Sequence, residues 1–307
     1  MKTMETVLET TALCKSYRRF KALDGVTMRV PKGAIYGLVG RNGAGKTTLI
    51  RLVCGLQDPT SGGYALYGRR WGERGIARVR RRMGAVVETP SLYGELTALD
   101  NLKIQSRVLG LPDDGQLPAL LELVGLGDTG RKKAKHFSLG MRQRLGIAVA
   151  LCGDPDFLVL DEPTNGLDPQ GIVEMRELIL RLNRERGITL LISSHILDEL
   201  SRLATCYGFL DQGRMVREVT AEELEASCRK CLRVRVTDNA ALMRVLDARG
   251  IEYAETRDGP VDVFGEVELT DLSMALLAEN CRLLSASERD ESLESYYINL
   301  VGGGSRA

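Results

Sequence analysis

A glycine-rich stretch that follows an apolar segment near the N-terminus has the spacing of a phosphate-binding loop. It fits G-x-x-x-x-G-K-[ST], and its residues are Gly40, Arg41, Asn42, Gly43, Ala44, Gly45, Lys46 and Thr47, with Thr48 opening the helical pattern that follows. The glycines let backbone N–H groups approach phosphates without Cβ clashes, and the N-terminus of the helix expected from about Gly45 adds partial positive charge. We expect Lys46 to neutralise the β- and γ-phosphates and Thr47 to ligate Mg²⁺.

Two adjacent acids end a second apolar segment, Phe157–Leu160, and are Asp161 and Glu162. Acids at the end of a strand commonly form a turn, but a phosphate-binding loop in the same chain favours a catalytic role. Asp161 suits a metal ion, directly or through water, because Mg²⁺ prefers oxygen ligands. Glu162 suits the deprotonation of an attacking water.

The elements that must position these residues read as an α/β fold over residues 1–219. Apolar strands at Ala34–Val39, Phe157–Asp161 and Ile188–Ser193 alternate with helices from about Gly45 and over 171–186, which predicts a parallel sheet with covering helices. Residues of about 89–155 interrupt this alternation, and we expect them to form an inserted helical subdomain. Its helical patterns cover Ala98–Leu109, Leu117–Val124 and Gly140–Cys152.

Residues 220–307 show a different order of elements. The pattern predicts strands at 232–236, 251–255, 261–269 and 282–286, helices at 239–249 and 271–280, and a last helix near 291–300. The order βαββαβ predicts a small C-terminal α+β unit of ferredoxin-like type, with an accessory role.

Composition limits the classes of partner. The chain has 42 Lys and Arg against 41 Asp and Glu, so no overall charge recommends nucleic acid or an anionic membrane as the main partner. Two local basic groups, 78–82 and 131–135, read better as solvated faces than as docking patches. Apolar runs are too short to cross a bilayer, and the first ten residues lack the apolar core of a secretory signal. Seven cysteines read as reduced, buried thiols, and we expect a cytosolic protein.

A third stretch, Phe137-Ser138-Leu139-Gly140-Met141, lies between the phosphate loop and the acidic pair, and begins a helical pattern. With it, residues of about 5–215 resemble the ATP-binding subunit of an ABC transporter, a P-loop NTPase whose corresponding motif is close to LSGGQ. Ser138 and Gly140 are the two positions that match.

The resemblance implies further roles. Tyr17 matches the aromatic residue on which adenine stacks, and Asp168, in Asn165-Gly166-Leu167-Asp168, matches the loop that crosses between subunits. His195 matches the histidine that contacts the γ-phosphate. Glu88 stands where the family usually has a glutamine that contacts Mg²⁺. Glu88, the variant Ser138 motif and the C-terminal Ser292–Tyr297 stretch resemble the bacitracin-resistance and lantibiotic-protection type of ABC ATPase.

The resemblance implies a homodimer that sandwiches ATP and Mg²⁺, with Lys46, Glu162 and His195 as its catalytic residues. It implies an integral-membrane permease as partner, a location at the inner face of the membrane, and export of a peptide antibiotic or other amphipathic compound. No nucleic acid is expected. Two alternatives remain open at this point: an ABC ATPase acting on nucleic acid or ribosomes, and a non-catalytic regulator that uses ATP only to dimerise.

Overall fold

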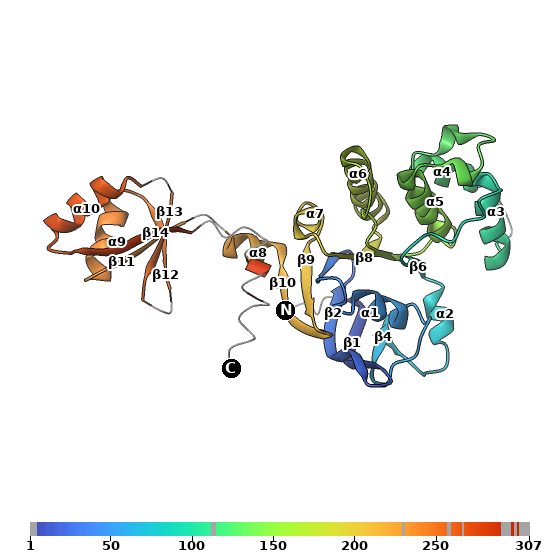
Figure 1. Cartoon of the computed structure of the whole chain (residues 1–307), viewed down its shortest axis with the longest axis horizontal. Helices are drawn as coiled ribbons and strands as arrows, with labels where there is room; N and C mark the ends of the chain where they lie inside the picture. Colours follow the sequence, from blue (N-terminus) through green and yellow to red (C-terminus); the bar gives the residue numbers. More distant parts are fainter. Residues whose placement is uncertain are drawn as a thin grey trace. The chain divides into compact units, whose positions relative to one another are not determined.

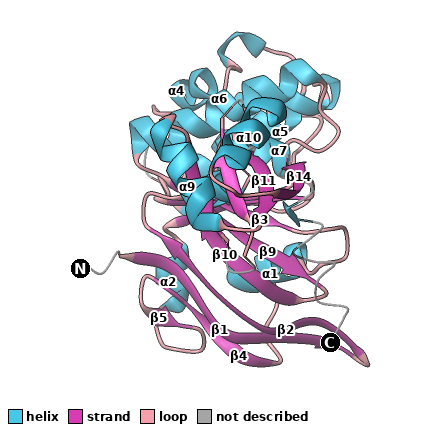
Figure 2. Cartoon of the chain, turned by 90° about the vertical axis from the view of Figure 1, so that its left-hand side faces the viewer, coloured by secondary structure: helices cyan, strands magenta, loops and turns pink. Residues whose placement is uncertain are grey.

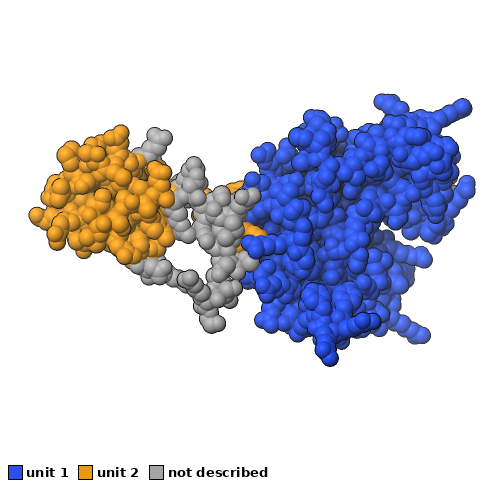
Figure 3. Space-filling view, in the orientation of Figure 1, with its two compact units in different colours: residues 1–221 blue, residues 222–307 orange. Residues whose placement is uncertain are grey.

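The computed structural model describes residues 5–111, 115–228, 231–256, 259–265, 267–289, 296, 297 and 300. They form two compact units, Met1–Ala221 and Glu222–Ala307, which are coloured separately in Figure 3.

The central sheet of unit 1 contains the strands that directly precede the phosphate-binding loop, Glu162 and His195. Its strands are β3 (Ile35–Val39), β6 (Met83–Val86), β7 (Phe157–Asp161), β8 (Thr189–Ser194), β9 (Cys206–Asp211) and β10 (Arg214–Thr220). Their order is β10-β9-β3-β8-β7-β6, with β10 antiparallel and the others parallel. Every residue of β3, β7 and β8 is buried, as expected for strands of a parallel sheet covered on both faces.

A second, antiparallel sheet lies on one side of unit 1 (Figures 1 and 2). Its strands are β1 (Thr6–Tyr17), β2 (Phe20–Pro31), β4 (Ser61–Leu66) and β5 (Arg69–Arg70), in the order β2-β1-β4-β5. Helix α1 (Lys46–Val53) buries its apolar residues in one core with this sheet and with β3 and β7. The sequence patterns above had not predicted this sheet.

The expected helical insertion consists of α3 (Ala98–Leu109), α4 (Leu117–Leu123) and α5 (Leu139–Leu151), which contact one another. Side-chain oxygens cap two of these helices: Thr97 accepts from the N–H of Asp100, and Ser138 from that of Met141. The remaining helices of unit 1 are α2 (Ile76–Arg80), α6 (Pro169–Arg186) and α7 (Leu197–Ser201), and 3₁₀ turns cover Gly127–Thr129 and Ala134–His136. Helix α6 begins two residues earlier than expected because Asp168 caps it and a proline occupies its first turn.

Unit 2 has the expected βαββαβ order. A short helix that was not expected, α8 (Ala221–Ser227), precedes this order. The order itself consists of β11 (Cys231–Val236), α9 (Asn239–Ala248), β12 (Glu252–Glu255), β13 (Val261–Phe264), α10 (Leu269–Ala278) and β14 (Leu283–Arg289). The strand order β12-β13-β11-β14 is antiparallel throughout, and α9 and α10 bury one apolar core against the sheet.

Some expected boundaries in unit 2 were wrong. The strand expected over 261–269 ends at Phe264, because Gly265 has a φ of 130° that an extended strand cannot contain. Helix α10 then begins at Leu269 instead of 271, and β14 extends to Arg289. The last helix, expected near 291–300, lies mostly outside the described residues. Within that range the structure describes residues 296, 297 and 300, and these are helical.

Candidate nucleotide-binding site

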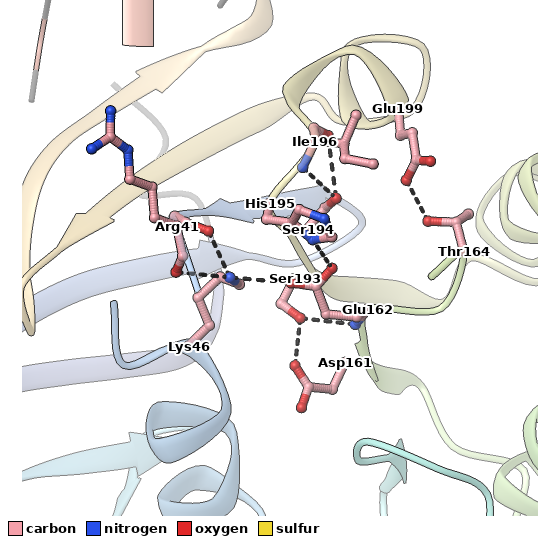
Figure 4. Close-up of polar contacts among 11 residues, drawn as sticks. Arg41, Lys46, Asp161, Glu162, Thr164, Ser193, Ser194, His195, Ile196 and Glu199 are labelled. Atoms are coloured by element: carbon pink, nitrogen blue, oxygen red, sulfur yellow. Dashed lines mark hydrogen bonds and ion pairs between the residues drawn. The ribbon is translucent and has the colours of Figure 1, made fainter. Parts of the chain in front are cut away.

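Three neighbouring strands end at the same edge of the central sheet, and each delivers one predicted motif there. The phosphate-binding loop follows β3, Glu162 follows β7, and His195 follows β8, which lies between the other two strands. Figure 4 shows the side chains from these three strand ends turned toward one another. Ligands of parallel α/β sheets bind at this carboxyl edge.

The loop itself needs glycine at two positions for steric reasons. A Cβ on Gly40 would lie 2.5 Å from the carbonyl oxygen of Leu210, and one on Gly45 would lie 2.7 Å from that of Ala22. Gly45 also has a φ of 108°, which L-residues rarely adopt. No side chain caps α1 among the described residues, so backbone N–H groups of its first turn remain available to an anion.

Lys46 is buried and its ammonium is surrounded by oxygen atoms. Nζ donates to the carbonyl oxygens of Gly40 at 2.6 Å and Arg41 at 3.3 Å, and it lies 3.1 Å from Oε1 of Glu162. A phosphate group entering the loop can replace the Glu162 carboxylate as the anionic partner of Lys46, which would release Glu162.

Glu162 is held on both sides. Its Oε2 lies 2.7 Å from Nδ1 of His195, and its backbone N–H donates to Oγ of Ser193 at 2.9 Å. Its φ of 51° lies in the left-handed region, which costs a non-glycine residue about 1–3 kcal/mol. The carboxylate that the sequence predicts as a base therefore lies between Lys46 and His195, in a strained but fixed backbone.

Asp161, the last residue of β7, precedes Glu162 and is buried. Its Oδ1 accepts a hydrogen bond of 2.6 Å from Oγ of Ser193, the same hydroxyl that accepts from the N–H of Glu162. Ser193 thus orients both acids, a role that the sequence had not indicated.

Burial keeps three cysteines of unit 1 protonated. It raises the pKa of the Cys54 thiol to about 12, and the negative charge of Asp161 adds to the rise. Burial also raises the pKa of Cys152 and of Cys206 to about 11. The cysteines with these values are thiols near neutral pH and not reactive thiolates.

A cavity of ≈ 310 Å³ lies over the loop. It is lined by Phe20, Ala22, Asn42, Gly43, Gly45, Lys46, Thr47, Thr48, Glu162 and Asn165. Phe20 and Asn165 had not been predicted as site residues. For Phe20 the signal available was an aromatic residue at the start of a strand directly after two arginines, which the structure leaves 65% exposed.

Several predicted residues do not line this cavity. Tyr17 is 40% exposed, and its hydroxyl donates to Oε1 of Gln57. Ser138 caps α5, accepting from the N–H of Met141 at 3.2 Å, and Asp168 caps α6, accepting from that of Gly171 at 3.0 Å. The start of α5 and the loop before α6 lie close together, because a Cβ added to Gly140 would be only 3.6 Å from Cδ2 of Leu167.

Glu88 is also absent from the cavity lining. It follows β6 with a φ of 59°, and its Oε1 lies 2.6 Å from Nη2 of Arg51 at the end of α1. Within the described part of the chain, no three His, Cys, Asp or Glu side chains come together as a metal cluster. Of the residues predicted for Mg²⁺, Thr47 lines the cavity, Asp161 is hydrogen-bonded to Ser193 and Glu88 is paired with Arg51.

A phosphate-binding loop, a carboxylate and a histidine at one sheet edge, with an inserted helical subdomain, define a P-loop ATPase. A family model described as ABC transporter matches residues 23–165, and the chain belongs to that family as an ATP-binding subunit. It is an ATPase whose hydrolysis of ATP is coupled to transmembrane transport.

The relatives found are transport subunits. The chain is 41% identical over 304 residues to the bacitracin transport ATP-binding protein BcrA of Bacillus licheniformis, covering 98% of this chain and 99% of that protein. It is 47% identical over 206 residues to the lantibiotic transport ATP-binding protein SrtF of Streptococcus pyogenes, covering 67% of this chain and 87% of SrtF. These similarities confirm the predicted family type and favour transport over the two alternatives.

A solved structure of an ATP-binding subunit of an ABC transporter superposes with a TM-score of 0.64. It is 32% identical, and the match covers 72% of this chain and 93% of the other. The predicted fold class is therefore confirmed. None of the helices in the described ranges combines the length and apolar character that a bilayer crossing requires.

Proposed function

We propose that two copies of the chain bind ATP between them, each supplying half of two composite sites. In this arrangement the phosphate loop of one copy holds the triphosphate, while Ser138 and Gly140 of the other copy contact the γ-phosphate. The observation that supports pairing is that Ser138, Gly140 and Asp168 do not line the loop cavity of their own chain. A helix start such as that of α5 suits an anion approaching from a second copy.

Residues around the cavity fit Mg²⁺. The Thr47 hydroxyl and the buried Asp161 carboxylate are hard oxygen ligands, and Mg²⁺ usually takes one or two protein ligands beside phosphates and water. Glu88 can join them only by leaving Arg51. When bound, the ion would supply positive charge between the β- and γ-phosphates.

Glu162 is the proposed general base. Entry of the γ-phosphate displaces its carboxylate from Lys46 and leaves it free to accept a proton from the attacking water. His195, 2.7 Å from the other carboxylate oxygen, holds Glu162 in place and contacts the γ-phosphate. Lys46 and the loop amides neutralise charge on the transferred group. The exposed rings of Tyr17 and Phe20 offer apolar area for adenine to cover.

A groove supports the proposed contact with a permease. It has a volume of ≈ 620 Å³ and is lined by residues of α2, β6, α3 and α5 and by the loop that contains Glu88's neighbours Val87 and Thr89. Most of its lining is apolar, which suits a short helix of a membrane subunit. The groove is lined both by the nucleotide-binding core and by the helical insertion, so movement of the insertion would change its shape.

The proposed task is export of a peptide antibiotic or other amphipathic compound by that permease. The chain would then lie on the cytoplasmic side, bound peripherally to the inner face of the membrane. Full-length similarity to a bacitracin transport subunit supports the cargo class, and unit 2 is proposed as an accessory domain within this assembly.

Replacement of Glu162 by Gln tests the catalytic assignment. It should leave ATP binding intact and lower phosphate release by at least about a hundredfold. Glu185→Gln, an exposed position on α6, is the matched control and should hydrolyse ATP normally.

Membrane fractionation tests the transport assignment. The chain should sediment with membranes when it is expressed together with the permease encoded by the neighbouring open reading frame, and not when it is expressed without that permease. Strictly soluble behaviour beside its permease would refute that part.

A further inference from the structure

An arginine-rich surface lies beside the groove. Residues 69–82 contain seven arginines and one glutamate, and they form β5, the following turn and α2. Helix α2 contacts both β4 and β5, so this segment forms one surface of unit 1.

Three of these arginines have partners within the protein. Arg69 lies 3.5 Å from Glu73, Nε of Arg82 donates to Asp156 at 3.1 Å, and Arg80 lies over the Tyr64 ring at 5.9 Å.

The other four are exposed and have no ion pair with any residue that the structure describes. We name them the arginine patch, and they are Arg70, Arg74, Arg78 and Arg81.

The spacing of these charges is unfavourable for a merely solvated helix. Arg78, on α2, has Arg81 three positions after it, at the C-terminal end of the helix, and like charges at this spacing destabilise a helix. A solvated helix is normally stabilised by acids at such positions, and the first turn of α2 has none. The whole chain carries a net charge of only +1, so this positive charge is local. An external anion would relieve the repulsion.

The shape of the patch points to the kind of anion. Its members are spread over β5, the turn before α2, the helix itself and the position directly after it. Such a spread fits a plane of phosphates better than a single carboxylate, and guanidinium groups bind phosphate oxygens in bidentate fashion.

The position of the patch is consistent with this anion. Helix α2 lines the groove through Ala77 and Arg80, so the patch borders the surface proposed above for a membrane subunit.

We propose that the arginine patch binds the anionic phospholipid headgroups of the membrane beside the permease. This rests on the proposed function, which brings the groove to the membrane side. Contact with headgroups would orient the subunit before and between encounters with the permease, at a surface separate from the nucleotide site.

Vesicle sedimentation with the full-length chain tests the proposal. At low salt, vesicles of equimolar phosphatidylcholine and phosphatidylglycerol should bind at least about tenfold more tightly than phosphatidylcholine vesicles, and about 0.5 M salt should abolish the difference. A triple variant, Arg70→Gln, Arg74→Gln and Arg78→Gln, should lose the difference. Arg81 is left unchanged because it lines the groove.

A control triple variant removes the same charge elsewhere: Arg131→Gln, Arg184→Gln and Arg186→Gln, all exposed positions. It should keep the preference for anionic vesicles. Equal binding to both vesicle types, or equal loss in both triple variants, would overturn the proposal. So would tighter binding through the patch to an RNA oligonucleotide at the same phosphate concentration. ATP hydrolysis without lipid should be unchanged in both variants, and its absence in the wild type would count against the proposed function alone.

Discussion

Removal of the buried hydroxyl of Ser193 should lower both the stability of the fold and the rate of hydrolysis, and the effect on the rate should be the larger one. In the wild type, Oγ of Ser193 donates to Asp161 at 2.6 Å and accepts from the N–H of Glu162 at 2.9 Å, and the residue is fully buried. Ser193→Ala leaves a buried carboxylate oxygen without this donor, which costs about 1–3 kcal/mol of the free energy of unfolding. At about 2–4 °C per kcal/mol for a domain of this size, the melting temperature should fall by several degrees.

The larger effect should be on hydrolysis. Both acids lose the group that orients them, so kcat should fall at least about tenfold while KM for ATP changes little, because the loop that binds phosphate is untouched. Phosphate release measured well below the melting temperature gives both parameters.

Thr189→Val is the matched control. Thr189 is buried at the opposite end of the same strand, where its Oγ1 accepts from the N–H of Gly33 at 2.9 Å. This variant should lose comparable stability and keep its kcat. Wild-type kcat in Ser193→Ala, or an equal loss of kcat in Thr189→Val, would refute the reasoning.

Three further predictions concern the surroundings of the site. Because the pKa of Cys54 is raised to about 12, iodoacetamide should alkylate this thiol slowly at pH 8 in the folded chain and quickly in urea, and equal rates by mass spectrometry would contradict the raised pKa. The neutral thiol contributes its full stability below about pH 9, and this contribution is lost as the pH rises toward 12. Glu88→Gln removes an exposed pair with Arg51 worth less than about 1 kcal/mol, so calorimetry should show a melting temperature within about 3 °C of wild type, and a larger drop would show that the pair is structural. Phe20→Ala should weaken ATP binding measured by calorimetric titration, as should Tyr17→Ala, and unchanged affinity in both would remove the proposed adenine contacts.

Local motifs were enough to identify the chemistry because each motif is recognised from residues that are adjacent in the sequence. The phosphate loop needs a strand before it and a helix after it, and both could be seen from apolar spacing around Gly40–Thr47. The acidic pair likewise follows an uninterrupted apolar strand. These features were sufficient to predict an α/β P-loop fold.

Features that depend on strand pairing could not be predicted in this way. Asp161 pairs with Ser193 only because β7 lies next to β8 in a particular register, and neither the order nor the register follows from either strand alone. The same holds for Phe20, which reaches the loop through the second sheet, and for Arg51, which meets Glu88 across the end of α1.

A mixing experiment tests the composite site most directly. Lys46→Ala disables the phosphate loop of its own chain, and Ser138→Arg disables the surface proposed to complete the site of the other chain. Each variant alone should hydrolyse almost no ATP. In an equimolar mixture, half of the random pairs contain one intact site, so phosphate release should recover to about a quarter of the wild-type rate. A mixture that shows only the average of the two separate rates would contradict a site shared between two copies.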